Sequence, residues 1–345
     1  MSLRTDLLLW FGLYAAIGYA GAWLARRYAL QRRLLDEPGE RRSHTVATPR
    51  GGGVAIVAAL SIAGLALILR QPIQIVSLAA GLVGLWLVAG IGWIDDHRPL
   101  SPWLRLAVHA LASAILAAGL WLGGLNPEIA LIAGGLSVVL VNVWNFMDGI
   151  DGIAATQAAL VAWVFAACAG GMVGGLLGLA LIGSICGFLP FNLPKARLFL
   201  GDVGSGALGY ALAWLAALAL AGTPEPLWPL LTLPLSAFLL DAGLTLASRM
   251  LRGERWWLPH VEHAYQRWAR RTGSHPRITA AFALWTAIAV IIVGYNVSAD
   301  RQGEVSGIAS VVLAWWVMGA ALWYGLRRRA NDQGPRNTSD RGVDA

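Results

Sequence analysis

The stretch LSVVLVNVWNFMDGIDG, residues 136–152, ends an apolar run of the chain with two amides, two carboxylates and two glycines. Such side chains must find partners in an apolar setting, because an unpaired polar group there costs several kcal/mol. If a helix continues through Asn142, Asn145 and Asp148, their spacing puts all three side chains on one face. These oxygens suit a hard cation, but a polar helix end followed by an Asp-Gly turn also explains the stretch.

The composition of the whole chain indicates a membrane protein. Of its 345 residues 57% are hydrophobic and only 13% are charged, as in chains that cross a bilayer repeatedly. Runs long enough to span a bilayer, about 20 residues each, lie at roughly 6–25, 51–69, 74–94, 106–123, 128–147, 153–170, 174–191, 204–222, 227–247, 278–296 and 305–326. We therefore expect an all-α, polytopic integral membrane protein with about eleven transmembrane helices. Residues 1–329 would form one transmembrane domain and residues 330–345 a disordered cytoplasmic tail.

The positive charges give this layout an orientation. With the N-terminus outside, all but three of the 26 Lys and Arg residues fall on the inner side, and the exceptions are Arg4, Arg70 and Arg301. Because cytoplasmic loops of membrane proteins are enriched in Lys and Arg, we expect a periplasmic N-terminus and a cytoplasmic C-terminus. The net charge of +7 is therefore explained by contact with the bilayer, and we expect no nucleic-acid partner.

Two acidic motifs border apolar runs on the predicted cytoplasmic side. Asp95 and Asp96 are adjacent at the end of the third run, and side-by-side carboxylates repel unless a divalent cation, an arginine or a shared proton lies near. The motif Gly201-Asp202-Val-Gly-Ser-Gly206 precedes the eighth run. It combines a helix start that favours anions with a carboxylate that can hold a cation. A solvated acid pair and an Asp N-cap with glycine turns are the alternatives.

Two basic segments and one acid inside an apolar run are further candidates for functional residues. Arg50 precedes three glycines that open the second run, where backbone amides could receive a phosphate or arginines could anchor to anionic lipid. Asp241 lies inside the ninth run, where an isolated charge is costly, so it needs a partner. The large loop around His260, His263 and Arg267 is predicted to form a cationic patch. Zinc is disfavoured for this histidine pair because no cysteine is near and the acids elsewhere suit a harder metal.

Taken in order, these motifs resemble the polyprenyl-phosphate N-acetylhexosamine-1-phosphate transferases, glycosyltransferase family 4. The resemblance spans nearly the whole chain and rests on Thr48-Pro-Arg-Gly-Gly-Gly53, Asp95-Asp96, Asn142-x-x-Asn145-x-x-Asp148-Gly-x-Asp151-Gly152, Asn192 through Gly201-Asp202-x-Gly-Ser205, and the histidine loop. The form His-x-x-His-Ala-Tyr-Gln-Arg is most similar to the O-antigen initiating branch. Val261 and Glu262 stand where the peptidoglycan branch carries more histidines, so a muramoyl-pentapeptide substrate is not expected.

The resemblance implies transfer of a sugar-1-phosphate from a UDP-N-acetylhexosamine, such as UDP-GlcNAc, to undecaprenyl phosphate with release of UMP. It implies Mg²⁺, or Mn²⁺, held by Asn145 and Asp202. The implied catalytic residues are Asp95, Asp96, Asp148, Asp151, His260 and His263. The implied substrate-binding residues are Arg50, Arg105, Asn142, Asn192, Phe199 and Arg267. The site would face the cytoplasm at a bacterial inner membrane, in a protein that can form a homodimer.

A different class of protein, an ion- or proton-coupled transporter, would also have many spans and intramembrane acids. The distribution of the acids argues against a transporter. They gather at one membrane face beside arginines and histidines, instead of lining a path through the midplane. Direct attack by the acceptor phosphate and a covalent intermediate both fit the sequence. Direct attack is favoured because a phosphate monoester is largely dianionic at neutral pH and needs positioning more than deprotonation.

Overall fold

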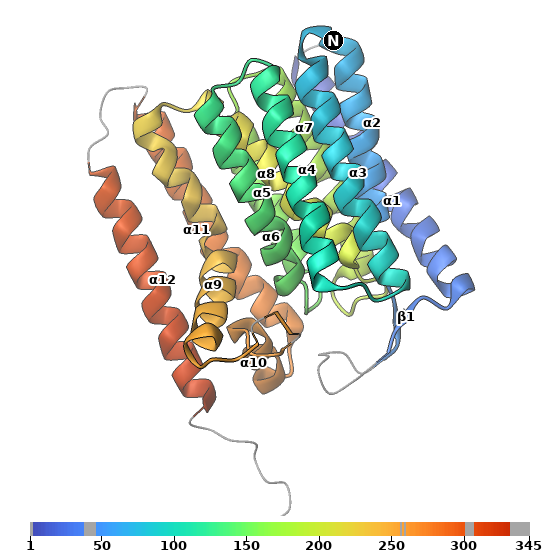
Figure 1. Ribbon diagram of the computed structural model, residues 1–345, viewed down its shortest axis with the longest axis vertical. Helices are drawn as coiled ribbons and strands as arrows, with labels where there is room; N and C mark the ends of the chain where they lie inside the picture. The colour runs from blue at the N-terminus through green and yellow to red at the C-terminus, as the bar shows by residue number, and fades with distance from the viewer. Residues whose placement is uncertain (1–2, 38–45, 256, 259, 301–306, 332–345) are drawn as a thin grey trace, which may run out of the picture.

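The computed structural model describes residues 3–37, 46–255, 257–258, 260–300 and 307–331. Figure 1 shows a bundle of long helices that run roughly alongside one another. The helices are α1 (Leu3–Arg32), α2 (Val54–Arg70), η1 (Pro72–Gln74), α3 (Ile75–His97), α4 (Pro102–Leu122), α5 (Pro127–Met147), α6 (Ile153–Cys168), α7 (Met172–Asn192), α8 (Asp202–Gly222), η2 (Glu225–Leu235), α9 (Ser236–Leu251), α10 (Ala264–Thr272), α11 (His275–Asp300) and α12 (Ile308–Asn331). Two short strands, β1 (Leu35–Asp36) and β2 (Thr48–Pro49), pair antiparallel.

The expected all-α, polytopic fold is confirmed. In the described ranges nine helical segments are long and apolar enough to cross a membrane, with η2 and α9 counted as one, and α2 and α6 are shorter apolar helices. Each of the eleven predicted runs coincides with one of these segments. The predicted disordered tail lies outside the described residues from 332 onward, and α12 continues to Asn331.

Helix α8 lies at the centre of the bundle. It packs against α3, α5 and α6, and nearly all of its residues are buried. Small residues permit this close packing. At Gly209, for example, any side chain would collide with the backbone carbonyl of Leu140 on α5. The N-terminus of α8, with Asp202, is therefore held against the C-terminal ends of α3 and α5.

Three local features depart from the sequence prediction. The β1–β2 pair joins Asp36 to Thr48 across an 11-residue gap, a contact without any local signal. The first half of the ninth predicted run is a 3₁₀ helix, η2, because Pro229 and Pro234 lack the backbone N–H that an α-helix needs. The histidine loop ends in a short amphipathic helix, α10, which the apolar-run criterion passes over because it is rich in arginine.

The polar motifs lie together at one end of the bundle. Helices α3, α5 and α7 finish there and α4, α6 and α8 begin there, because successive helices alternate in direction. Figure 1 places β1 and α10 at this end and the N-terminus at the opposite end. The residues of distant motifs can therefore meet.

Candidate active site

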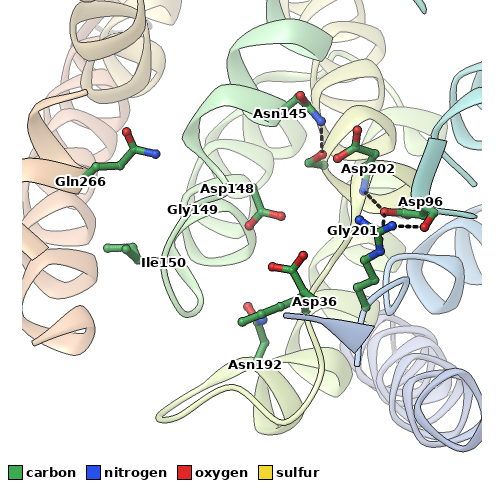
Figure 2. A pocket seen from close by; sticks show the side chains of 13 residues that line it. Asp36, Asp96, Asn145, Asp148, Gly149, Ile150, Asn192, Gly201, Asp202 and Gln266 are labelled. Atoms are coloured by element: carbon green, nitrogen blue, oxygen red, sulfur yellow. Dashed lines mark hydrogen bonds and ion pairs between the residues drawn. The ribbon is translucent and has the colours of Figure 1, made fainter. Parts of the chain in front are cut away.

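A cavity of about 210 Å³ opens at this end of the bundle. Figure 2 shows side chains from several helix ends pointing into it. It is lined by Asp36, Arg50, Asp96, Asn145, Asp148, Gly149, Ile150, Asn192, Phe199, Gly201, Asp202, Ser205 and Gln266. We call it the polar cavity. Of the predicted site residues it thus gathers Arg50, Asp96, Asn145, Asp148, Asn192, Phe199 and Asp202.

Asp96 connects α3 to the start of α8. Its two carboxylate oxygens accept the backbone N–H groups of Asp202 at 3.1 Å and Val203 at 3.2 Å. A carboxylate at a helix N-terminus satisfies unpaired amides and interacts favourably with the helix dipole. Gly201 has φ +75°, and a Cβ there would lie 2.6 Å from Asp96 Oδ2. Only glycine allows this approach, so Asp96 is a buried cap of α8 at the cavity wall.

Arg105, from the first turn of α4, links three of the motifs. One guanidinium nitrogen, Nη1, donates to Asp95 and to Asp202 Oδ2, the latter at 2.8 Å. The other, Nη2, donates to Asn145 Oδ1 at 3.4 Å. Asp95 also accepts the N–H of Leu100 at 2.6 Å and is not among the residues that line the polar cavity. The two adjacent acids therefore have different partners: Asp95 binds the guanidinium of Arg105, and Asp96 binds the backbone at the start of α8.

Asp148 is the exception among these acids. It follows the last residue of α5, and no hydrogen bond or ion pair within the described ranges reaches its carboxylate. Burial raises the pKa of the Asp148 carboxyl well above its usual range, and the charges of the neighbouring aspartates raise it further. Figure 2 shows Asp148 directed into the polar cavity toward the side of Asp36 and Asp202. The ionised form of Asp148 thus has no cationic partner in the described part of the protein, and a bound cation would stabilise it.

Three predicted site residues are committed elsewhere. Asn142 donates to Val138 O of its own helix at 2.8 Å and is not among the cavity-lining residues. Asp151 is also absent from that lining, because its carboxylate accepts from Ala196 N at 3.0 Å and lies 3.0 Å from His275 Nδ1. Asn192 lines the cavity, but both polar atoms of its amide group have a backbone partner.

The Asn192 amide group crosslinks two backbone segments. Its Oδ1 accepts from Gly152 N and its Nδ2 donates to Leu198 O, both at 3.0 Å. Two of the three glycines before α2 are similarly occupied, since Gly52 N donates to Phe199 O at 2.9 Å and Gly53 N to Leu200 O at 2.8 Å. These two amides hold the loop before α8 against α2. In this structure they are not available to receive an anion, contrary to that interpretation of the glycine motif.

The histidine loop lies beside the polar cavity and does not line it. The His263 ring is buried and stacks on Phe146 with centroids 6.2 Å apart, and the His260 ring lies 4.9 Å from it. Burial lowers the pKa of His260 to about 4 and lowers that of His263 as well. Both imidazoles are therefore neutral at pH 7, and the prediction of a cationic patch is wrong for the two histidines.

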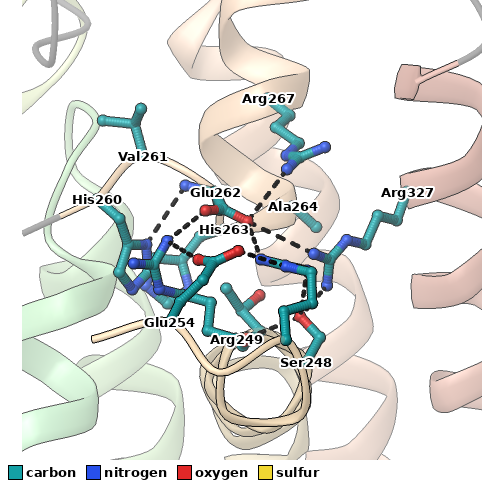
Figure 3. Close-up of polar contacts among 12 residues, drawn as sticks. Ser248, Arg249, Glu254, His260, Val261, Glu262, His263, Ala264, Arg267 and Arg327 are labelled. Carbon is teal, nitrogen blue, oxygen red and sulfur yellow. Dashed lines mark hydrogen bonds and ion pairs between the residues drawn. The ribbon is translucent and has the colours of Figure 1, made fainter. Parts of the chain in front are cut away.

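Arg267 belongs to a separate charged group shown in Figure 3. We call it the arginine–glutamate cluster; it consists of Arg249, Arg252, Glu254, Glu262, Arg267 and Arg327. Glu262 ion-pairs with four of these arginines, including Arg267 at 3.5 Å. The cluster joins α9, α10 and α12, and Arg267 does not line the polar cavity.

Asp241 has the partner that the sequence required. Its carboxylate accepts from Ala264 N at 2.7 Å and Tyr265 N at 2.9 Å, so it caps α10. The Tyr265 hydroxyl donates to Phe146 O at 3.0 Å, which ties α10 to the end of α5. This places Gln266 in the wall of the polar cavity. Gln266, Asp36 and Ser205 are cavity residues that our sequence analysis did not select.

The polar cavity has the donors that a hard cation requires. Asn145 and Asp202 supply oxygens, Asp148 faces them without a cationic partner, and Asn145 Nδ2 is oriented by Ser205 Oγ at 3.1 Å. No group of three or more His, Cys, Asp or Glu side chains converges as a metal cage in the described ranges. Mg²⁺ is usually held by one or two carboxylates together with waters and substrate phosphates, so this sparse set fits it.

The chain that forms this cavity is similar to known proteins. Residues 78–220 match the family model of glycosyl transferase family 4, a segment that runs from α3 through α8. The phospho-N-acetylmuramoyl-pentapeptide-transferase of Heliobacterium modesticaldum is 31% identical, with 81% of this chain and 94% of that protein covered. The chain belongs to glycosyl transferase family 4.

Other members of glycosyl transferase family 4 are similar over most of their length. The decaprenyl-phosphate N-acetylglucosaminephosphotransferase of Mycobacterium tuberculosis is 29% identical, with 93% of this chain and 89% of the relative covered. The undecaprenyl-phosphate alpha-N-acetylglucosaminyl 1-phosphate transferase of Yersinia pestis is 28% identical over 87% and 85%. The family resemblance inferred from the motifs is therefore confirmed, and the relatives belong to more than one of its branches.

Proposed function

We propose that the protein transfers N-acetylhexosamine-1-phosphate from a UDP-N-acetylhexosamine to a polyprenyl phosphate, with undecaprenyl phosphate as the acceptor. The observation that carries this proposal is that Asp148, an acid without a cationic partner in the described ranges, lines one cavity together with Asp202, Asn145 and Arg50. Such a cavity suits a cation between anionic groups. The names of the relatives, which are sugar-phosphate transferases acting on polyprenyl phosphates or muramoyl-pentapeptide, agree with it.

The proposed reaction joins the polyprenyl phosphate to the sugar-bearing phosphate of the donor and releases the other phosphate of the donor as UMP. An oxygen of the polyprenyl phosphate attacks the phosphorus that carries the sugar, the bond between the two phosphates of the UDP-sugar breaks, and UMP leaves. Positioning and charge neutralisation dominate such transfers. Arg50 is partly exposed in the cavity and can contact a phosphate, and Phe199 presents a ring on which uracil can stack.

Asn145 and Asp202 would hold the Mg²⁺, which when bound neutralises charge on the reacting phosphates. Arg105 donates to both residues and so fixes their orientation from behind. Asp95 anchors Arg105, and Asp96 fixes the start of α8 that carries Asp202. We therefore assign Asp95, Asp96 and Arg105 to positioning, a change from the catalytic and substrate-binding roles expected from the sequence.

The finer identity of the substrates is also a proposal. The His-x-x-His form of the loop favours the O-antigen initiating branch, with an N-acetylhexosamine such as GlcNAc and a product used for a cell-surface polysaccharide. Because the basic loops lie at the same end as the polar cavity, the positive-inside rule supports a cytoplasmic active site in a bacterial inner membrane. A homodimer is compatible with the exposed apolar surface of the bundle.

The test is UMP release by the purified protein in detergent with undecaprenyl phosphate and a panel of UDP-N-acetylhexosamines. We expect UMP to appear only with both substrates and a pyrophosphate-linked lipid to form in equal amount. UMP release without lipid acceptor would contradict the proposal. Transport of a solute into vesicles without any lipid product would favour the transporter alternative instead.

A further inference from the structure

A second cavity, of about 440 Å³, lies among α9, α10, α11 and α12. We call it the apolar cavity, because aliphatic and aromatic side chains make up most of its lining. Helix α10 contributes to both cavities: Tyr265 and Trp268 line the apolar one, whereas Gln266 lines the polar one. The two cavities share no lining residue. Pockets of this size hold small organic ligands or part of a larger one.

The apolar cavity opens between two membrane-spanning helices. Ala281 on α11 and Leu322 on α12 line it and are both exposed. Both helices pack against η2, and the rings of Trp285 on α11 and Trp315 on α12 meet with centroids 4.1 Å apart and planes tilted by 38°. Both indole N–H groups donate to Ser236 Oγ, at 2.9 and 2.8 Å. The gap between the two helices forms a slot that has the fixed indole of Trp285 in its lining and exposed side chains on two candidate membrane spans, where lipid can reach it.

A positive charge stands at the other end of the slot. Arg277, in the first turn of α11, lines the cavity, is exposed, and has no hydrogen bond or ion pair within the described ranges. Along α11 it precedes Trp285 by eight residues, about 12 Å of helix. An anionic head with one hydrocarbon chain matches this pattern of a charged mouth and an apolar slot.

We propose that the apolar cavity binds one hydrocarbon chain of an anionic phospholipid, with the lipid phosphate against Arg277. The occupant is a phospholipid and not the acceptor, because a phosphate held at Arg277 lies outside the polar cavity where the acids gather. The bound chain packs against Tyr265 and Trp268. Since the Tyr265 hydroxyl also holds Phe146 O, next to Met147 and Asp148, an occupied slot steadies α10 and the end of α5.

The test uses photolabelling, which does not depend on transferase activity. The protein is placed in phosphatidylcholine nanodiscs that contain a small fraction of phosphatidylglycerol with a diazirine near the end of one chain, and labelled peptides are mapped by mass spectrometry. We expect label on the segments of α10, α11 and α12 that line the slot. A matched phosphatidylcholine probe should label them severalfold less.

Three variants separate the head from the chain. Arg277→Gln should lower phosphatidylglycerol labelling about fivefold, the effect of one interfacial positive charge, and leave phosphatidylcholine labelling unchanged. Ala281→Leu, at an exposed position that tolerates a larger side chain, should fill the slot and lower labelling by both probes. Arg98→Gln, an exposed arginine at the end of α3 outside the cavity, is the control and should change neither.

Two results would overturn the proposal. Equal labelling by the two probes would mean that ordinary annular lipid enters the gap. Displacement of the label by polyprenyl phosphate at concentrations well below those of phosphatidylglycerol would mean that the acceptor chain occupies the slot. Failure of UMP release in every lipid would refute the proposed function, but it would leave the labelling result to be judged separately.

Discussion

The polar cavity and the arginine–glutamate cluster are both rich in charge, and they lie at the same end of the bundle, yet their charges are balanced differently. In the cluster, Glu262 meets four arginines and Glu254 meets two. In the cavity, Asp148 has no cationic partner within the described ranges, and Asp202 shares Arg105 with Asp95. The cluster is complete in the protein alone, whereas the lining of the cavity has more acids than arginines.

This difference separates structural charge from functional charge. Paired charges can connect helices, and the cluster joins α9, α10 and α12 without any ligand. Unpaired acids in a cavity reduce stability, and such strained arrangements persist where a ligand completes them. The contrast predicts that substitutions in the cavity will mainly affect turnover, whereas substitutions in the cluster will mainly affect stability.

The largest effect is expected in the polar cavity. Asp202→Asn removes a carboxylate that we propose holds the cation, so turnover measured as UMP release should fall by at least about 100-fold while the protein remains folded. Asp6→Asn, at an exposed acid of α1 outside the cavity, is the matched control and should behave as wild type. Near-normal turnover of Asp202→Asn would remove this residue from the site.

A somewhat smaller effect is expected beside the cavity. His263→Ala should lower turnover roughly 100-fold or less, because it removes the ring that stacks on Phe146 near Asp148 and a directed hydrogen-bond donor. His260→Ala should act in the same direction. Arginine at either position should not restore the rate, because both imidazoles are neutral at pH 7 and their shape, not their charge, is used. Full rescue by arginine at both positions would show that the loop supplies only charge.

The cluster should respond in stability. Glu262→Gln leaves its arginines without their shared anion and should lower the free energy of unfolding by about 1–2 kcal/mol, measured as a lower apparent melting temperature in detergent. Turnover at low temperature should stay near that of wild type. Glu128→Gln, at the exposed start of α5, is the control. A large loss of turnover without loss of stability would break the distinction between the two regions.

The smallest effect should have the opposite sign. Because the pKa of Asp148 is raised in the folded protein, its ionisation opposes folding above the ordinary pKa of an aspartate. Asp148→Asn should therefore stabilise the protein at pH 8 in EDTA, on the order of 1 kcal/mol. The gain should shrink as the pH falls and vanish below about 3, where the wild-type carboxyl is protonated in both the folded and the unfolded state. Melting curves across this range would check the sign, and a pH-independent difference would contradict it.

The membrane fold could be predicted from the sequence because hydropathy acts within single segments. Each predicted run became a helix, and the requirement for a partner correctly indicated that Asp241 is bound, to the N-terminus of α10. Helix α10 itself was missed, because nine residues with three arginines do not stand out among long apolar runs. The 3₁₀ helix η2 could have been predicted from Pro229 and Pro234, because proline lacks the backbone N–H that an α-helix needs.

The site was only partly predictable because its pairings are tertiary. The motifs indicated which segments meet, but not that Asp151 would be used by Ala196 and His275 or that Asn192 would crosslink two backbone segments. Asp36 reaches the cavity through a strand pair with no sequence signature. The neutral state of the histidines likewise follows from burial, which a loop sequence does not reveal.

The most direct test of the account is the dependence of UMP release on divalent cation. If Asn145 and Asp202 of the polar cavity hold a cation beside Asp148, UMP release with undecaprenyl phosphate and a UDP-N-acetylhexosamine should be lost in excess EDTA. Activity should return with Mg²⁺ or Mn²⁺, and Asp202→Asn should require a much higher Mg²⁺ concentration or fail to respond. Full wild-type activity in excess EDTA would contradict the account.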